Sequence, residues 1–212
     1  MGRGSGRTPC SGQRAGPVSG HVAGHHRRRP VVCGHRPLTG DTSPGHLLDV
    51  RAFRRFVNTV GVVAVTKDGT TNAMAAEWTT PISIEPRLIG VYVGDTRYTW
   101  ELIRDATAFG LSLLTERQGG VSHVLGSYSG REDPKRSRLP EWLQPGAVLP
   151  VPLVRDASAH FECRLVDRHR YGDHILVVGS PVAARVIEED RPLLYHGGRY
   201  HRLGPQLPKP ES

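Results

Sequence analysis

Short β-branched segments joined by turn residues leave this chain few ways to fold. Residues 61–66 and 71–76 flank an Asp-Gly pair at 68–69, which is a strong hairpin signal. Residues 159–165 alternate apolar and polar side chains and lead to a second turn at 171–173. Consecutive strands of this kind predict a mainly β protein with a few helices. They favour a closed antiparallel barrel, because closure removes exposed sheet edges, and they argue against the strand-helix alternation of a Rossmann sheet.

The remaining periodicities predict three helices and further strands. Asp49 is placed to cap a helix over residues 50–60, where apolar residues recur at helical spacing. Helices are also expected over 99–105 and over 116–125, the second weakened by two glycines, and an irregular polar loop is expected over 126–140. The other expected strands cover residues 88–93, 109–114, 174–178, 193–196 and 199–203.

The basic charge of the chain is concentrated near its start. The 212 residues carry a formal net charge of +8, and residues 1–45 contain seven Arg, no Lys and one acid, Asp41. This segment is rich in Gly, Pro and His and lacks aromatic residues, so it cannot bury enough apolar surface to offset the entropy of ordering. We therefore expect a disordered tail over 1–45, one domain over 46–204 and a C-terminal tail over 205–212. Nucleic-acid binding inferred from the charge would rest on the first tail alone.

The sequence also indicates a compartment. No apolar run approaches the roughly 18 residues that a membrane-spanning helix needs, and the N-terminus lacks the apolar core of a secretory signal. Of the three cysteines only Cys163 lies in the body of the chain, so no internal disulfide framework is expected. We expect a cytoplasmic protein.

Patterns that would indicate protein-only catalysis or a metal centre are missing. The chain has no Gly-x-Ser-x-Gly elbow, no HExxH or CxxC pair and no GxxxxGK[ST] phosphate loop. The histidines of the body are scattered without metal-ligand spacing, and Cys163 alternates with apolar residues as a buried thiol does. We predict no catalytic side chain and no metal ligand.

Two polar segments interrupt the apolar pattern. The first, 72–81, is rich in small side chains, which let a planar ligand approach the backbone, with Trp78 as a stacking wall. The second, 95–101, opens a helix at which Arg97 and Thr99 offer a guanidinium and a hydroxyl to a phosphate, beside free backbone N–H groups. An ordinary helix cap with a solvated arginine is the alternative for the second segment. Together the two segments fit one ligand that has a ring and a phosphate.

Five segments in a fixed order carry a resemblance to a known family. They are 72–78 (NAMAAEW), 97–103 (RYTWELI), 125–131 (LGSYSGR), 163–166 (CRLV) with 172–174 (GDH), and 192–200 (PLLYHGGRY). On these residues the chain resembles the flavin reductase-like family of FMN-binding split barrels, over about residues 49–204. The resemblance implies a split antiparallel β-barrel, usually a homodimer, with FMN at or near the subunit interface.

The resemblance also implies which residues hold the flavin. The first segment would line the isoalloxazine edge, Arg97 and Thr99 would hold the phosphate, and residues 129–131 would approach from a loop. Glu77 departs from the family pattern, and its carboxyl either points to solvent or lowers flavin affinity as an acid beside the ring. Residues 132–136 lack an aromatic anchor that the family frequently carries. The expected cofactor-binding residues are Asn72, Ala73, Met74, Ala75, Ala76, Trp78, Thr79, Arg97, Tyr98, Thr99, Ser129, Gly130 and Arg131.

The activity that the resemblance implies is hydride transfer from NAD(P)H to FMN, with FAD as the alternative flavin. In such a flavin reductase the cofactor carries the chemistry, while the protein stacks the two rings and stabilises negative charge with backbone N–H groups. Tyr200 and His201 are candidates to border the nicotinamide, and the alternative is that they are ordinary aromatic side chains at the barrel edge. A flavin-dependent monooxygenase would be the partner that receives reduced flavin. The alternatives are a non-enzymatic FMN-bound electron carrier of the flavoredoxin type and a nucleic-acid-binding protein that uses the basic tail.

Overall fold

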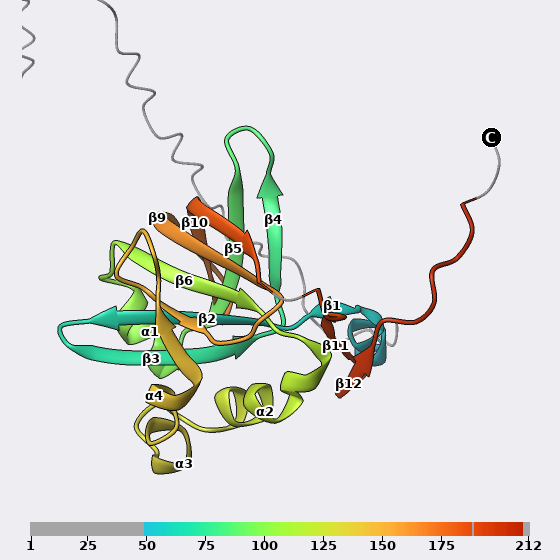
Figure 1. Cartoon of the computed structure of the whole chain (residues 1–212), viewed down its shortest axis with the longest axis horizontal. Helices are drawn as coiled ribbons and strands as arrows, with labels where there is room; N and C mark the ends of the chain where they lie inside the picture. Colours follow the sequence, from blue (N-terminus) through green and yellow to red (C-terminus); the bar gives the residue numbers. More distant parts are fainter. Residues whose placement is uncertain (1–48, 188, 210–212) are drawn as a thin grey trace, which may run out of the picture. The chain divides into compact units, whose positions relative to one another are not determined.

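The scaffold of the protein is a seven-stranded antiparallel sheet, seen in a computed structural model that describes residues 49–187 and 189–209 (Figure 1). The strand order is β3-β2-β6-β9-β10-β5-β4. Strands β2 and β3 run across Figure 1 whereas β4 and β5 stand nearly upright, so the sheet curls round on itself. The strands are β2 (Gly61–Lys67), β3 (Thr70–Ala76), β4 (Thr79–Ser83), β5 (Leu88–Gly94), β6 (Ala108–Leu113), β9 (Ala159–Tyr171) and β10 (His174–Val186).

The prediction of a mainly β, antiparallel protein with a few helices is confirmed. The two expected turns join β2 to β3 and β9 to β10, and Gly69 and Gly172 in them have φ angles of 75° and 61°, which glycine adopts without strain. Among the described strands no ladder joins β3 to β4, so the hydrogen-bonded sheet ends at these two strands. Residues 1–45, for which we expect a tail, lie outside the described residues, and so does any role of their basic charge.

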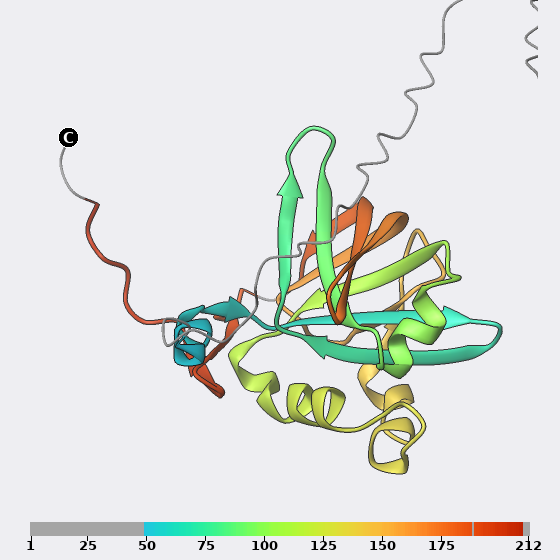
Figure 2. The ribbon, with the colours of Figure 1, turned by 180° about the vertical axis from the view of Figure 1, so that it is seen from behind.

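Two smaller sheets and several short helices complete the fold. Helices α2, α3 and α4 lie together on one side of the β2–β3 hairpin (Figure 2). Within the described ranges no helix has the length and apolar character that crossing a membrane requires. The elements are η1 (Val50–Arg55), β1 (Asn58–Thr59), α1 (Tyr98–Ile103), η2 (Glu116–Gln118), α2 (Gly119–Ser127), α3 (Asp133–Arg136), α4 (Leu139–Trp142), β7 (Leu143–Pro145), β8 (Pro152–Val154), β11 (Leu193–His196) and β12 (Arg199–Arg202).

The helix predicted over residues 50–60 is wrong in its second half. A 3₁₀ helix ends at Arg55, and β1 follows and pairs with β11. The backbone N–H of Val60 donates to the Leu193 carbonyl at 2.9 Å, and the Val60 carbonyl accepts from Leu114 at 3.0 Å. Pairing with a strand far along the chain therefore outcompetes the local helical periodicity. Phe53 is left 65% exposed as a result.

Two further differences concern elements that contain proline or glycine. Strand β4 is not among the expected strands. It contains Pro81 and lies at the edge of the sheet, where proline removes no ladder hydrogen bond on the solvent side. The helix expected over 116–125 divides into η2 and α2. The loop expected over 126–140 contains α3, with Pro134 in its first turn, where the missing N–H has no intrahelical partner to lose.

Strand β2 separates two apolar cores. Val63 and Val65 face a cluster that includes Phe109 on β6, whereas Val62 and Ala64 face a second cluster that packs beneath α2 and α4. The period-2 alternation of a strand thus buries both faces of β2. Cys163, predicted to be a buried thiol, is fully buried in the first cluster, and that burial raises its pKa to about 12. At neutral pH Cys163 is therefore a protonated thiol that packs in the core.

Two glycines give a test of the packing between β6 and β8. A side chain at Gly110 would place its Cβ 2.0 Å from the Pro152 carbonyl oxygen, whereas a Cβ at exposed Gly120 in α2 would meet nothing within 4 Å. We expect Gly110→Ala to lower the free energy of unfolding by about 1–3 kcal/mol through overpacking. The control Gly120→Ala should raise it by about 0.5 kcal/mol, because alanine is the better helix former. Urea unfolding of both variants checks the opposite signs, and equal stabilities would contradict this account of the β6–β8 contact.

Candidate functional site

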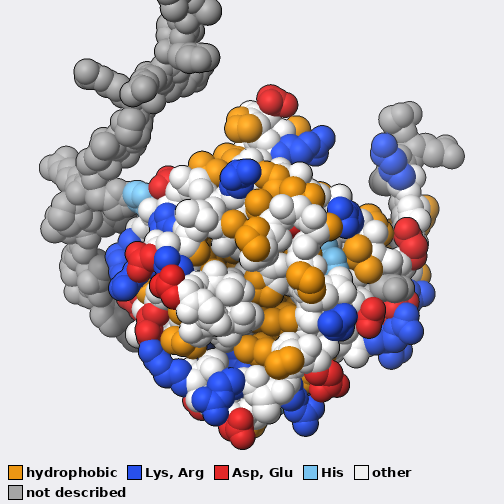
Figure 3. Space-filling model, turned by 60° about the vertical axis from the view of Figure 1, so that its left-hand side comes forward, with side chains coloured by type: hydrophobic (Ala, Val, Ile, Leu, Met, Phe, Trp, Pro, Cys, Tyr) orange, Lys and Arg blue, Asp and Glu red, His pale blue; other side chains and the backbone are white. Residues whose placement is uncertain are grey.

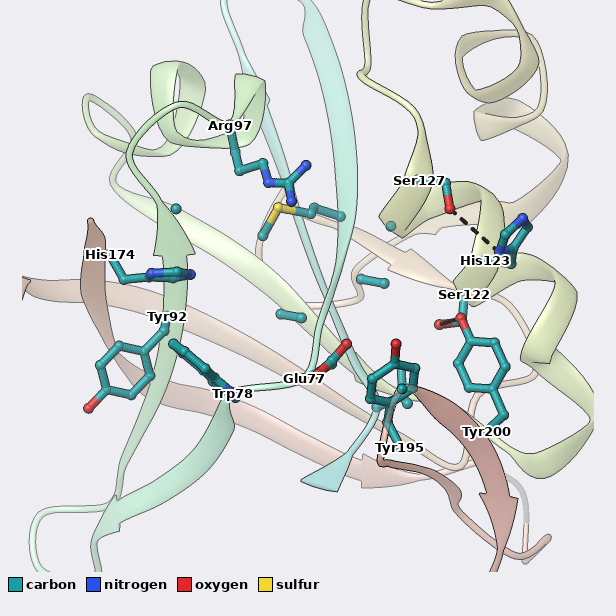
Figure 4. Close-up of a pocket in the computed structure, with 17 residues that line it drawn as sticks. Glu77, Trp78, Tyr92, Arg97, Ser122, His123, Ser127, His174, Tyr195 and Tyr200 are labelled. Carbon is teal, nitrogen blue, oxygen red and sulfur yellow. Dashed lines mark hydrogen bonds between the residues drawn. The ribbon is translucent and has the colours of Figure 1, made fainter. Parts of the chain in front are cut away.

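A cavity of about 600 Å³ lies where the end of β3 and the loop after it meet β5, α2 and the β11–β12 hairpin (Figure 4). Its two side walls differ in character. Arg97, His174 and the aromatic rings of Trp78 and Tyr92 stand on one side, and a polar face of α2 with Tyr200 stands on the other. A volume of this size is typical of cofactor and substrate pockets, which span roughly 300–1,000 Å³.

The aromatic wall is built by strand pairing. The Tyr92 N–H on β5 donates to the Trp78 carbonyl at 3.0 Å, and the Trp78 and Tyr92 rings meet edge to face with centroids 6.1 Å apart. His174 begins β10, opposite Gly94, and its ring lies 4.8 Å from the Trp78 ring at a tilt of 41°. Trp78 remains 51% exposed, so a ring face is open to a planar ligand. The expectation that Trp78 forms a wall of the site therefore fits its position.

The opposite wall is one face of α2. His123 and Ser127 are four residues apart, and the His123 Nδ1 lies 3.5 Å from the Ser127 Oγ. The Tyr200 hydroxyl, from β12, donates to the Ser122 Oγ at 3.0 Å and so ties the small sheet to this helix. Gly126 of α2 lies over Ala75 of β3, where a Cβ on the glycine would make an ordinary van der Waals contact of 3.5 Å with the Ala75 Cβ. The wall carries hydroxyls and an imidazole but no carboxylate.

Glu77 brings a carboxylate to the floor of the cavity. It follows β3, is half-buried and lies near Tyr195 (Figure 4). Burial raises the pKa of the Glu77 carboxyl above its ordinary value, and burial followed by the nearby Glu77 raises the pKa of Tyr195. The acid that departs from the family pattern thus faces the cavity and is partly shielded from water.

A second cavity, of about 180 Å³, continues from the first. The two share Met74, Arg97, Gly126 and Ser127. The smaller one extends between α1, the end of β3 and the segment that runs from α2 into α3. The first cavity can accept a ring system, and the second can accept a polar extension of the same ligand.

Asn72 gives the smaller cavity its polar chemistry. Its side chain is fully buried and its Nδ2 donates to the Thr99 Oγ1 at 2.8 Å, which leaves the Thr99 proton free to donate. The Asn72 Oδ1 has no hydrogen-bond partner among the described residues. A buried acceptor without a partner costs about 1–3 kcal/mol, so the geometry indicates a ligand that supplies a donor. At Gly130 a Cβ would stand 2.2 Å from this Oδ1, so only glycine fits there.

Lys135 adds a cation to the same cavity. Its side chain is almost completely buried, and the Nζ donates to the carbonyls of Leu125 and Tyr128 at 3.2 and 3.1 Å. Burial, followed by the neighbouring Arg97, lowers its pKa to about 8, while Glu132 opposes the shift. With Arg97, which also borders the cavity, two basic side chains meet at one end of the site.

The structure brings most of the predicted cofactor-binding residues together. Three do not line either cavity. Ala73 faces the core beneath α2, since β3 alternates its side chains. Thr79 donates to the Ala76 carbonyl at 3.3 Å from the start of β4. Arg131 is held by Glu101 at 2.6 and 3.1 Å. The residues that line a cavity are Asn72, Met74, Ala75, Ala76, Trp78, Arg97, Tyr98, Thr99, Ser129 and Gly130.

Sequence reasoning missed other lining residues. The α2 face could have been found from spacing, because residues 122, 123, 126 and 127 fall on one side of a helix. Nothing local marks Tyr92, and His174 belongs to a segment of the family resemblance without having been assigned to the site; both reach the cavity through strand pairing. Of the two C-terminal candidates, Tyr200 lines the cavity and His201 does not. Across the described ranges no three His, Cys, Asp or Glu side chains converge as a metal ion would need.

The buried lysine makes a testable contribution to stability. Its pKa in the folded protein is about 8 against 10.5 in an unfolded chain, so the unfolded state binds more protons between these values. The stability of the wild type, relative to Lys135→Met, should therefore increase as the pH rises from 8 towards 10.5. Urea unfolding of both ligand-free proteins across this range measures the difference. A difference that stays constant with pH would contradict the unfavourable burial of the charge.

The fold agrees with the comparisons to known proteins. A family model described as a flavin reductase like domain matches residues 53–204. The chain is 31% identical over 190 residues to the NADH-dependent FMN reductase AsuE2 of Streptomyces nodosus subsp. asukaensis, across 88% of this chain and 98% of that protein. It is 28% identical over 178 residues to HsaB, the reductase subunit of a flavin-dependent monooxygenase of Rhodococcus jostii, across 82% of this chain and 88% of that protein.

Another relative and a solved structure extend the comparison. A match to an uncharacterized protein of Archaeoglobus fulgidus, 34% identical over 109 residues, covers 51% of this chain and 62% of that protein. The structure of the NADH:FAD oxidoreductase SgcE6 of Streptomyces globisporus C-1027 superposes with a TM-score of 0.69 at 25% identity. The match covers 77% of this chain and 100% of that chain. Because the family model matches well over half of the described residues, this chain belongs to the flavin reductase-like family.

Proposed function

We propose that this protein is an NAD(P)H-dependent flavin reductase that binds FMN and passes a hydride to it from the nicotinamide. The observation that carries the proposal is that two cavities with different linings share residues and so form one continuous site. One has an open aromatic wall, and the other is enclosed by basic and hydroxyl side chains. A planar ring with a phosphorylated polyol tail is the kind of ligand that needs both. The AsuE2 and SgcE6 relatives, named for FMN and FAD respectively, support a flavin in this role.

The residues present fit such a group. The Asn72 Oδ1 needs a donor, which a hydroxyl of the polyol can supply. Thr99 offers a hydroxyl proton, and Arg97, which points into the larger cavity in Figure 4, lines both cavities. Helix α1 has only six residues, so the expected help from a helix dipole is small and side chains supply the positive charge.

Each group of residues has a role in this proposal. Trp78 and the β3 residues Met74, Ala75 and Ala76 border the ring, while Arg97 and Thr99 hold the phosphate end. A bound flavin supplies the hydride acceptor. The chain itself positions the two rings, leaves one ring face accessible beside Trp78 and limits water below it. No nucleophile or acid-base pair is needed for that work, which agrees with the missing catalytic motifs.

Release of reduced flavin to a monooxygenase is the further step that we propose. The likeness to HsaB, named as a monooxygenase reductase subunit, supports it. The half-exposed Trp78 supports it too, because a cofactor that lies against an open wall can be exchanged. The alternative is an electron carrier that keeps its flavin and is not reduced by NAD(P)H.

We also propose that the protein acts as a homodimer. Ile84 in the β4–β5 hairpin is 79% exposed and Phe53 is 65% exposed. An apolar hollow of about 310 Å³ lies beside the same hairpin, lined in part by Phe161 and Pro181. Hydrophobic side chains also gather among the charged ones on the face in Figure 3. Exposed apolar surface of this kind supports association of two copies.

The test of the activity is spectroscopic. The purified protein should bind FMN with a change in the flavin spectrum, and added NADH or NADPH should bleach the flavin absorbance in the absence of oxygen. With oxygen present, NAD(P)H should be consumed continuously. Bound FMN that neither nucleotide reduces would favour the electron carrier, and absence of flavin binding would refute the proposal.

Arg97 and Thr99 can be tested against a matched control. Arg97→Ala and Thr99→Ala should each weaken FMN binding by about 1–3 kcal/mol, the range for losing a hydrogen bond to a charged group. Arg131→Ala should change it by less than about 0.5 kcal/mol, because that guanidinium is paired with Glu101 and stacked 4.2 Å above the Tyr98 ring. Fluorescence titration measures all three. A larger loss in Arg131→Ala than in Arg97→Ala would contradict this assignment.

A further inference from the structure

Lys135 is a buried cation without an acidic partner. Its side chain is 2% exposed, and no carboxylate among the described residues forms an ion pair with it. An ammonium taken out of water is strongly unfavourable unless its charge is compensated. The fold alone offers it two backbone carbonyls, those of Leu125 and Tyr128. The compensation is therefore incomplete in the protein without a ligand.

Lys135 has one N–H donor more than the acceptors that the fold gives it, and this lysine lines the smaller cavity. An ammonium group has three donors, and two of them are accounted for by the carbonyls at the end of α2. Lys135 lines the cavity of about 180 Å³ together with Arg97, Thr99 and the unpartnered Asn72. A ligand group in this space meets a guanidinium and a hydroxyl donor from the start of α1 and an ammonium from α3.

The charges around this space suit a compact dianion. Arg97 comes from the loop before α1 and Lys135 from α3, and Glu132, before α3, is the acid that opposes them on the cavity wall. Tyr98 and Tyr128 contribute phenols, and β3 contributes the uncharged Asn72. The Glu101–Arg131 pair is internally neutral and does not line the cavity.

We propose that Lys135 is a specificity-determining ligand for a terminal phosphate monoester, and that a monoester bound in the smaller cavity draws a proton from solvent onto its amine. This inference rests on the proposed function, since FMN carries such a group at the end of its polyol. Riboflavin ends there in a hydroxyl. In FAD the corresponding phosphorus carries one charge and a phosphoanhydride bond to the AMP half, so it compensates the two cations less well. Lys135 thereby favours FMN over both.

A dependence of affinity on pH follows from the burial. In the empty site the pKa of Lys135 is about 8, and a dianion within hydrogen-bond reach raises it. A phosphate monoester has its second pKa near 6, so it stays dianionic from pH 7 to pH 9. Over that range the free protein loses the lysine proton and the complex keeps it. The FMN dissociation constant should therefore rise about tenfold between pH 7 and pH 9.

The experiment compares three flavins on four proteins. Fluorescence titrations with FMN, FAD and riboflavin at pH 7, 8 and 9 are run on the wild type, Lys135→Met, Lys135→Arg and the control Lys67→Met, whose lysine lies at the end of β2 beside Asp68. We expect Lys135→Met to weaken FMN at least about tenfold at pH 7 and to remove the pH dependence. Riboflavin affinity should stay unchanged and FAD should change less than FMN. Lys135→Arg should keep FMN affinity and lose the pH dependence, because arginine stays charged.

The outcomes separate this inference from the proposed function. If Lys135→Met keeps the FMN affinity of the wild type, or keeps its pH dependence, the inference is overturned while flavin binding stands. If the variant loses riboflavin as strongly as FMN, Lys135 is only structural and the inference is again overturned. If the wild type binds none of the three flavins, the proposed function itself fails. Calorimetry of FMN binding in two buffers of different ionisation enthalpy should give net proton uptake at pH 8, and none in Lys135→Met.

Discussion

Burial of β2 on both faces is the constraint on which the rest of the structure depends. Its alternate side chains enter two different cores, so the strand can shift neither along nor across the sheet without exposing one of them. Strands β3 and β6 are fixed on its two sides by direct pairing. The helices α2 and α4 then have a single apolar surface on which to pack. The α2 wall of the site follows from this arrangement, whereas the aromatic wall depends on the pairing of β5 with β10 and with Trp78.

The site exists because β3 carries small side chains and glycine occurs where elements converge. Ala75 and Gly126 add little side-chain volume where α2 faces β3, and only glycine at position 130 leaves room for the Asn72 side chain. The polar groups that remain in this space are not satisfied by the fold: Asn72 keeps an acceptor without a partner and Lys135 keeps an incompletely compensated charge. Such groups reduce the stability of the empty protein, and a ligand that matches them recovers that free energy.

This view explains how a reductase can work without catalytic motifs. The chain supplies an aromatic wall, a floor of small residues and a basic end, and these are positioning elements for two planar cofactors. Glu77 is the feature of this chain that is least expected there, because its carboxyl faces the larger cavity from the loop after β3. Its burial favours the neutral form of the carboxyl, because a charged carboxylate loses solvation there.

The sequence by itself determined the strands with strong alternation, the two hairpin turns and the small-residue segment after residue 72, because these depend on local backbone preference and on a period of two. It also carried the family resemblance that pointed to Arg97 and Thr99. Only the tertiary structure decided that the chain after Arg55 pairs as a strand, that Arg131 turns to Glu101, and that Tyr92, His174 and Lys135 reach the site. Those outcomes depend on contacts between residues distant in sequence, where burial and charge outweigh local propensity.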